Sequence, residues 1–154
     1  PVQVRSDIMI TFVVLGTPRP QGSLKLFKAK SGKTIAQHSS TTLEWRGLVT
    51  AQVRAQMRSS EMLTGPLSVS MIFDMARPKG HYGTGKNADK LKDSAPNLYH
   101  AQMPDLDKLA RSVNDSLTDA GVWEDDGQVA VMNVAKRWCT NGDVPGVEIV
   151  IEAL

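Results

Sequence analysis

The sequence predicts an α+β fold in which a mixed β-sheet carries two main helices packed on one face. Four short runs are rich in β-branched residues, and two longer segments repeat apolar residues at helical spacing. These elements occur in the order strand, helix, strand, helix, strand, strand, which is typical of α+β domains. The length of 154 residues suits one domain, which we expect to span residues 1–154.

The first half of the chain is predicted to contain one strand, a hairpin and one helix. The strand covers residues 8–15 (IMITFVVL) and ends in a segment rich in Gly and Pro. Residues 24–30 and 33–37 flank a Ser-Gly pair and are expected to form a short hairpin. The helix is predicted over residues 41–58, beginning with a capping box (TTLE). Its apolar face recurs every four positions, at Trp45, Val49, Val53 and Met57.

The second half is predicted to contain the rest of the sheet and the second helix. A strand at residues 66–75 precedes a loop at 76–104, and a loop of this length in a compact domain is usually functional or mobile. The helix is expected at residues 107–118, because its apolar residues lie on one face and a glycine follows it. The last two strands are expected at residues 129–138 and 147–153.

The net charge of +2 conceals an uneven distribution. Residues 1–60 contain nine Lys and Arg against two Asp and Glu, whereas residues 105–154 contain four against ten. A basic first part favours a polyanionic partner such as nucleic acid. An acidic second part would repel that partner unless metal ions neutralised it. Enzymes that cut phosphodiesters combine basic groups with carboxylates that hold divalent metal ions.

Several classes of protein are excluded by composition and motif. No apolar run approaches the roughly 18 residues that span a bilayer, so a membrane protein is excluded. With one cysteine, Cys139, and scattered histidines, neither an internal disulfide nor a zinc site is expected, and we expect a cytoplasmic protein. Residues 80–87 (GHYGTGKN) nearly match a phosphate-binding loop, but Asn87 replaces the hydroxyl that binds Mg²⁺. No nucleotide cofactor is therefore expected.

The residues that point to chemistry lie between positions 103 and 128, where seven acidic side chains accompany only two basic ones. In an extended segment, Asp105 and Asp107 would leave the same face with Cα atoms about 6.6 Å apart. Two such carboxylates can bind one metal ion or a pair of ions. The second helix is expected to be roughly 18 Å long, and the segment from its end to Asp126, when extended, is just long enough to run back to its start. Asp125 and Asp126 are therefore candidates for a third ligand.

A purely structural explanation stays open. Aspartates near a helix start are favoured by capping and by the helix dipole without any metal. Asp107, Arg111 and Asp115 are spaced four apart and could form a solvated ladder of ion pairs. Against this explanation, Asp105 and Asp107 together exceed what capping requires, and the later acidic pair lies close to the apolar residues Trp123 and Val129.

The acidic motif also has a fixed pattern of apolar, glycine and tryptophan residues. Its members are Asp105, Leu106, Asp107, Leu109, Arg111, Asp115, Leu117, Gly121, Trp123, Asp125, Asp126 and Gln128. This pattern resembles the signature of RusA-type Holliday junction resolvases. The resemblance extends to Gly16–Pro18 and to the predicted helix around Trp45. It also includes Lys136 and residues 145–149 near the end of the chain. The long loop resembles versions encoded by phages and prophages.

The resemblance implies a small homodimeric endonuclease, in a bacterial or phage-infected cell, that needs Mg²⁺ or Mn²⁺ and cuts four-way DNA junctions. Carried over residue by residue, the metal ligands would be Asp105, Asp107 and Asp126, with Asp125 adjacent. The family's catalytic lysine falls on Arg111, which keeps the positive charge but cannot lose a proton near neutral pH. Arg111 is therefore expected to act electrostatically, with Lys108 as a second basic group.

Basic side chains outside the motif are candidates for DNA contact. Most precede the first helix, and the others lie in the long loop and near the acidic motif: Arg19, Lys25, Lys28, Lys30, Lys33, Lys86, Lys108 and Lys136. Clustered cations of this kind bind phosphates. The alternative that the hairpin and the loop are merely solvated surface stays open.

We expect a metal-dependent endonuclease that resolves four-way junctions by paired symmetric nicks, with metal-activated water attacking the phosphodiester in line. Two nicks require two active sites related by a two-fold axis, which predicts a homodimer. Two alternatives stay open. One is an endonuclease for a broader range of branched or flap DNA on the same fold, and the other is a non-catalytic DNA-binding protein whose acidic cluster is structural.

Overall fold

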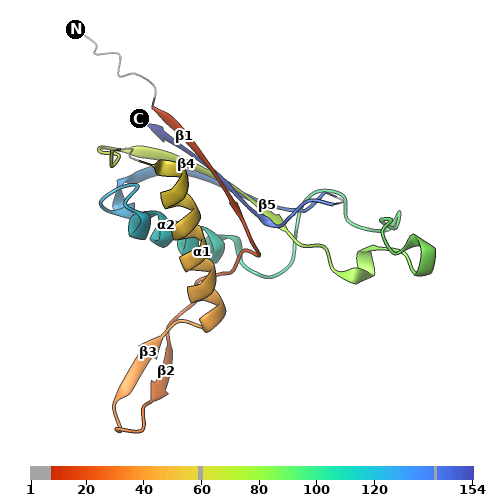
Figure 1. Cartoon of the computed structure of the whole chain (residues 1–154), viewed down its shortest axis with the longest axis horizontal. Helices are drawn as coiled ribbons and strands as arrows, with labels where there is room; N and C mark the ends of the chain where they lie inside the picture. Colours follow the sequence, from red (N-terminus) through yellow and green to blue (C-terminus); the bar gives the residue numbers. More distant parts are fainter. Residues whose placement is uncertain (1–7, 59–60, 141) are drawn as a thin grey trace.

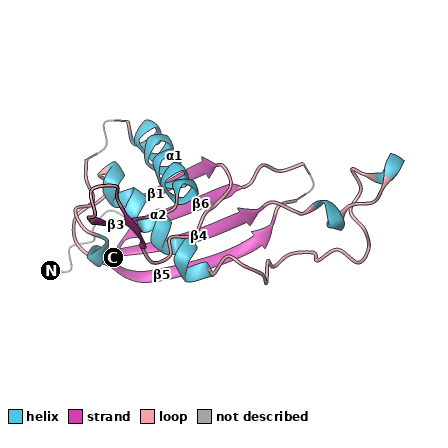
Figure 2. Cartoon of the chain, turned by 90° about the horizontal axis from the view of Figure 1, so that it is seen from below, coloured by secondary structure: helices cyan, strands magenta, loops and turns pink. Residues whose placement is uncertain are grey.

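The computed structural model describes residues 8–58, 61–140 and 142–154. Its two α-helices, α1 (Ser40–Met57) and α2 (Leu106–Ala120), pack together on one face of a four-stranded sheet (Figure 1 and Figure 2). The predicted α+β fold, with both helices on one face, is confirmed. In the described parts of the chain, neither helix is apolar over a length sufficient to cross a membrane.

The strands of this sheet lie in the order β1-β6-β4-β5. Their bounds are β1 (Met9–Leu15), β4 (Leu67–Met75), β5 (Val129–Trp138) and β6 (Gly146–Ala153). β6 pairs antiparallel with both β1 and β4, whereas β4 and β5 run parallel. The sheet is therefore mixed, and each strand lies within one or two residues of its predicted position.

The hydrophobic core fills the space between the sheet and the helices. On the strands, alternate residues face the helices and are buried: Phe12, Val14, Val69, Met71, Phe73, Val147, Ile149 and Ile151. The helices contribute the stripes that their spacing predicted: Trp45, Val49, Val53, Leu109, Val113 and Leu117. Each such side chain contributes about 1.5–3 kcal/mol on burial, so this layer is the main support for the surface residues around it.

The ends of the helices show one wrong prediction and one confirmed one. The N-cap of α1 is Ser39, two residues before the threonine predicted to cap the helix, and the Ser39 hydroxyl accepts a hydrogen bond from the Thr42 amide at 3.3 Å. α2 ends at Gly121, whose φ of 80° suits glycine and whose amide bonds the carbonyls of Leu117 and Thr118. The predicted glycine stop is confirmed.

The two edges of the sheet differ. At the β1 edge, the amides of Gln52 and Gln56 on α1 bond the backbone of Leu15 and Val13, both as donors and as acceptors, at 2.7–3.0 Å. These bonds cover the free edge of β1. At the β5 edge, residues 98–100 bond only the last residues of the strand, and residues 130–133 are exposed. The first part of β5 is therefore an open edge within the described chain.

Two segments project from this body. β2 (Lys25–Lys28) and β3 (Thr34–Gln37) form the predicted hairpin and pair with each other (Figure 1). The long loop between β4 and α2 extends in another direction and contains the single 3-10 turns η1 (Lys79–His81) and η2 (Gly85–Asn87). Residues 80–87 thus form turns, without the α-helix that follows the phosphate-binding loop of a nucleotide hydrolase.

Candidate active site

Asp105 and Asp107 lie at the start of α2. Asp105 is the N-cap residue, with φ −65° and ψ 137°, and Asp107 lies in the first turn. The extended spacing suggested by the sequence is wrong, because the helix begins between the two aspartates. An N-cap aspartate ordinarily accepts a hydrogen bond from an amide of the first turn, but the Asp105 side chain makes no such bond. The Asp105 carboxylate therefore does not serve to cap the helix.

The carboxylate of Asp105 pairs with Lys108, whose ammonium lies 2.7 Å away. The hydrogen bond and the charge of Lys108 lower the pKa of Asp105, and the same pair raises the pKa of Lys108. Both groups are therefore charged at neutral pH. Lys108, a predicted DNA-binding residue, contacts an aspartate in this structure.

Asp107 and Arg111 complete a small cluster of charges on the exposed side of the first helical turns. Both side chains are exposed, and the charges of Asp107 and Arg111 act on the pKa of Lys108 in opposite directions. We call Asp105, Asp107, Lys108 and Arg111 the N-terminal cluster. It places two carboxylates and two cations within one and a half turns of helix, the combination expected around a phosphodiester.

The ladder of ion pairs considered as an alternative does not form in the described chain. Asp115 turns away from Arg111 and lies 3.6 Å from Arg46 of α1, while its carboxylate also accepts a hydrogen bond from Gln21. Arg46 pairs with Asp119 as well, at 2.7 Å. The later aspartates of α2 thus hold α1 and α2 together, which leaves Asp107 and Arg111 outside that structural network.

Lys136, on β5, supports the segment that leads into α2. Its ammonium donates hydrogen bonds to the carbonyls of Gln102 and Pro104, the latter at 2.6 Å. The charge of Lys136 also contributes to the lowered pKa of Asp105. Lys136 is a predicted DNA-binding residue; in the structure its bonds fix the backbone next to Asp105.

Asp125 and Asp126 differ although they are adjacent in the sequence. Both precede β5: Asp125 is the N-cap residue of the turn η3 (Asp126–Gln128), and Asp126 is the first residue of that turn. The Asp125 carboxylate accepts a hydrogen bond from the Gly127 amide at 2.6 Å, and the Gln128 side-chain oxygen accepts one from the Asp125 amide. Asp126 is exposed, and in the described chain its carboxylate makes no hydrogen bond or ion pair. Asp125 is occupied in holding the turn, whereas Asp126 is available.

The structure does not bring Asp126 to the N-terminal cluster within one chain. Asp126 lies just before the start of β5, whereas Lys136 and its partner Pro104 lie near the end. Val129 and Lys136 are seven residues apart on the strand, or about 23 Å. Across the described residues, no three Asp, Glu, His or Cys side chains are grouped so that they could hold a metal ion.

The reason is the path of the chain after α2. The Leu63 amide bonds the Val122 carbonyl at 2.8 Å, and the buried Trp123 indole donates to the Thr118 hydroxyl at 2.7 Å. These contacts hold residues 122 and 123 beneath the C-terminal end of α2. The segment after α2 therefore does not run back along the helix to Asp105 and Asp107, as the sequence suggested.

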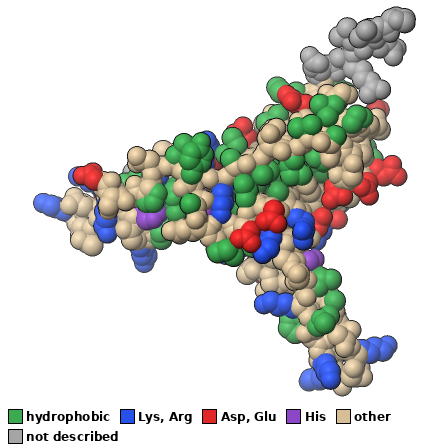
Figure 3. Space-filling view, turned by 180° about the vertical axis from the view of Figure 1, so that it is seen from behind, with side chains coloured by type: hydrophobic (Ala, Val, Ile, Leu, Met, Phe, Trp, Pro, Cys, Tyr) green, Lys and Arg blue, Asp and Glu red, His purple; other side chains and the backbone are tan. Residues whose placement is uncertain are grey.

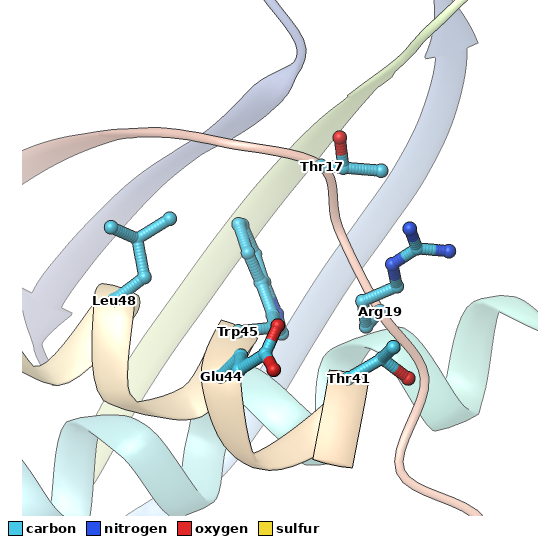
Figure 4. Close-up of a pocket in the computed structure, with 6 residues that line it drawn as sticks. All are labelled: Thr17, Arg19, Thr41, Glu44, Trp45 and Leu48. Atoms are coloured by element: carbon cyan, nitrogen blue, oxygen red, sulfur yellow. The ribbon is translucent and has the colours of Figure 1, made fainter. Parts of the chain in front are cut away.

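The other predicted basic residues are exposed and lie away from the N-terminal cluster. In the hairpin, Lys25 begins β2, whereas Lys28, Lys30 and Lys33 lie near the turn, where Figure 3 shows basic side chains at the tip. Lys86 lies in η2. Arg19 follows β1 and, with Thr17, lines an open pocket of about 340 Å³ against Thr41, Glu44, Trp45 and Leu48 (Figure 4). This pocket contains none of the cluster residues, so it carries no part of the proposed chemistry.

Two features near the site were missed from the sequence. The backbone amide of Gln21 donates a hydrogen bond to the backbone carbonyl of Lys108 at 3.0 Å, which links the base of the hairpin to the N-terminal cluster. His100 is buried against the Trp138 ring, with centroids 4.2 Å apart, and burial together with the charge of Lys136 lowers the pKa of His100. Isolated Gln and His residues have no spacing pattern, so no sequence signal could identify these contacts.

A comparison with protein families gives a match over most of the chain. The family model described as "Endodeoxyribonuclease RusA" matches residues 16–152, nearly the whole chain. No curated protein matches the sequence. The match includes the N-terminal cluster, the hairpin and the turn that contains Asp126, and it confirms the resemblance seen in the sequence. The chain therefore belongs to the RusA family of endodeoxyribonucleases.

Proposed function

We propose that this protein is a homodimeric, Mg²⁺- or Mn²⁺-dependent endonuclease that resolves four-way DNA junctions by paired symmetric nicks. The observation that carries the proposal is the N-cap aspartate that does not cap. Asp105 directs its carboxylate to Lys108 beside the exposed Asp107, in a chain of an endodeoxyribonuclease family. Helix stability does not explain this arrangement, because a capping bond would stabilise the helix more directly.

The donors suit a hard divalent cation. Mg²⁺ is commonly held by one or two carboxylates together with water and substrate phosphates, and Asp105 and Asp107 would supply the carboxylates. The chemistry that such an ion supplies is activation of water for in-line attack and neutralisation of charge at the phosphate. In the structure, Lys108 pairs with the Asp105 carboxylate, so a metal ion bound by that carboxylate would free the Lys108 ammonium for the DNA backbone.

The two basic residues of the cluster would bind and stabilise the phosphate. Arg111 remains protonated at any physiological pH, and a lysine ammonium, whose ordinary pKa is about 10.4, is charged near neutral pH as well. Neither residue is therefore suited to remove a proton from water. Their contribution would be electrostatic, through charge-assisted hydrogen bonds to phosphate oxygens that strengthen as negative charge develops.

A second subunit would supply the third carboxylate. Asp126 lies before the start of β5, and the open edge of that strand is available for pairing. Antiparallel pairing of two β5 edges about Met132 would place Val129 of one subunit opposite Ala135 of the other, next to Lys136. Asp126 of the partner subunit would then approach the N-terminal cluster. The two-fold axis would create two such sites, as paired nicking requires.

The proposal is tested by incubating the protein with a synthetic four-way junction, a flap substrate and a linear duplex, with Mg²⁺ or with EDTA. We expect symmetric nicks on the junction but not on the other substrates, with Mg²⁺ present and not with EDTA. Equal cutting of the flap would favour a broader branched-DNA endonuclease. Binding of the junction without cleavage at any Mg²⁺ or Mn²⁺ concentration would leave a non-catalytic DNA-binding protein and contradict the proposal.

A further inference from the structure

The hairpin of β2 and β3, which we call the arm (residues 24–37), exposes apolar side chains far from the core. Figure 1 shows it extending from the body, and Figure 3 shows basic side chains toward its tip. Every residue of both strands is exposed, and Leu26 is 72% exposed, Phe27 52% and Ile35 49%. An isolated two-stranded ribbon gains little stability in water, so the exposed apolar side chains indicate a surface that binds a partner.

The register of the arm gives both of its faces the same character. Phe27 lies opposite Ile35 on one face, and Leu26 lies opposite Ala36 on the other. A lysine flanks each apolar pair, because Lys25 shares the face of Phe27 and Lys28 shares the face of Leu26. A flat protein surface would cover one face and leave the other exposed. A partner that surrounds the ribbon would contact the apolar side chains on both faces.

The charge of the arm identifies the partner as nucleic acid. Residues 16–43 contain one Arg and four Lys but no Asp or Glu. A two-stranded ribbon has dimensions that DNA accommodates, and phosphates would neutralise its lysines. Aromatic and aliphatic side chains bind bases that are unstacked or partly exposed, which an intact duplex does not offer. Branched DNA offers such bases where strands exchange.

The base of the arm lies next to the proposed catalytic residues. The Gln21 amide, three residues before the arm, bonds the Lys108 carbonyl at 3.0 Å, and the Gln21 side chain bonds Asp115 of the same helix. DNA held by the arm would therefore lie close to Asp105 and Asp107. An arm that contacts the branch point would also fix the distance from that point to the phosphate to be cut.

We propose that the arm enters the branch point of the DNA, with Phe27 and Leu26 against unstacked bases and its lysines on the flanking phosphates. The inference rests on the proposed function, since it assigns how that site selects branched DNA. Selection would then depend on the availability of unstacked bases rather than on base sequence, because stacking on an aromatic face tolerates any base.

The test uses a four-way junction with 2-aminopurine, a base whose fluorescence rises on unstacking, at the branch point. Binding is measured in the Asp107→Asn protein, so that cleavage does not interfere. The parent should raise the fluorescence, and adding Phe27→Ala should abolish most of the rise and lower junction affinity about tenfold, with duplex affinity unchanged. Lys28→Ala should weaken junction and duplex binding alike and reduce the salt dependence. Met9→Ala, an equally exposed apolar truncation on β1, should change neither.

The outcomes separate the arm from the proposed function. If the parent binds junctions in preference to duplex but Phe27→Ala keeps both the fluorescence rise and the preference, the arm proposal is overturned and the proposed function stands. A dimer that dissociates on Phe27→Ala, measured by light scattering, would assign the arm to a second copy and also overturn it. If the parent shows no preference for junctions, both proposals fail.

Discussion

Asp105 and Asp125 occupy equivalent positions, each as the N-cap residue of a helical turn, yet they behave differently. Asp125 accepts a 2.6 Å hydrogen bond from Gly127 and closes a reciprocal box with Gln128. Asp105 makes no capping bond and pairs with Lys108 instead. The same residue type, as an N-cap residue, thus caps its turn in one region and pairs with a lysine in the other.

The difference has a physical basis in what each turn needs. η3 has three residues and connects α2 to β5, so it depends on local bonds from Asp125 and Gln128. α2 has fifteen residues and a buried apolar stripe, so tertiary packing stabilises it without help at its first turn. A long, well-packed helix can leave its N-cap carboxylate without a capping bond, and a single turn cannot.

The largest effect is expected at Asp107. Asp107→Asn keeps the size of the side chain but removes the charge that a divalent ion requires. A loss of several kcal/mol in transition-state stabilisation corresponds to cleavage about 10³-fold slower. Single-turnover cleavage of a four-way junction measures this rate, and junction affinity should be retained. Cleavage at the parent rate would exclude Asp107 from the metal site.

The adjacent pair Asp125 and Asp126 provides a matched comparison. Asp126→Asn should slow cleavage about 100-fold, as expected for a metal ligand. Asp125→Asn should change it less than about threefold, because an asparagine oxygen still accepts the bond from Gly127. The same cleavage assay measures both variants. The reverse order of effects would move the ligand role from Asp126 to Asp125.

Lys136 is expected to have a smaller effect, through position. Lys136→Met removes the bonds to the Gln102 and Pro104 carbonyls, so cleavage should fall about tenfold through misplacement of Asp105. Lys136→Arg, which keeps the charge and the donors, should restore part of the rate. Junction affinity and its salt dependence should not change. If affinity falls with a salt slope lower by about one, Lys136 contacts a phosphate, as the sequence suggested.

The smallest effect is expected on stability. Asp125→Ala removes a capping bond and should lower the free energy of unfolding by about 1 kcal/mol. Asp105→Ala should leave the urea midpoint nearly unchanged, because Asp105 makes no cap and its pair with Lys108 is solvent-exposed. Urea denaturation followed by tryptophan fluorescence measures both. Equal destabilisation by the two substitutions would remove the distinction between the two aspartates.

Much of the fold could be predicted because each main element carries its own periodicity. The α1 stripe from Trp45 to Val53, the alternation in β4 and the glycine after α2 are local patterns, and the structure follows them. The start of α1 was missed because Ser39 and Thr41 are both good capping residues. The sequence alone does not determine which of them is used.

The candidate site could be predicted in part. The residue types at positions 105–111 identified the cluster, but two of the contacts there depend on tertiary structure. Lys136 reaches the segment before α2 from β5, and Gln21 reaches Lys108 from the base of the arm. The position of Asp126 also depends on how Trp123 packs beneath the helix. Chain-length arithmetic allowed a return to Asp105 that the core packing does not make.

The most direct test of the shared site uses heterodimers of two inactive variants. Asp107→Asn and Asp126→Asn chains, co-expressed with different affinity tags, are purified as the mixed dimer and assayed on a four-way junction. If each site combines Asp107 of one subunit with Asp126 of the other, the mixed dimer retains one intact site. It should then nick a single strand, although each homodimer is inactive. A mixed dimer as inactive as the two homodimers would contradict a site built from both subunits.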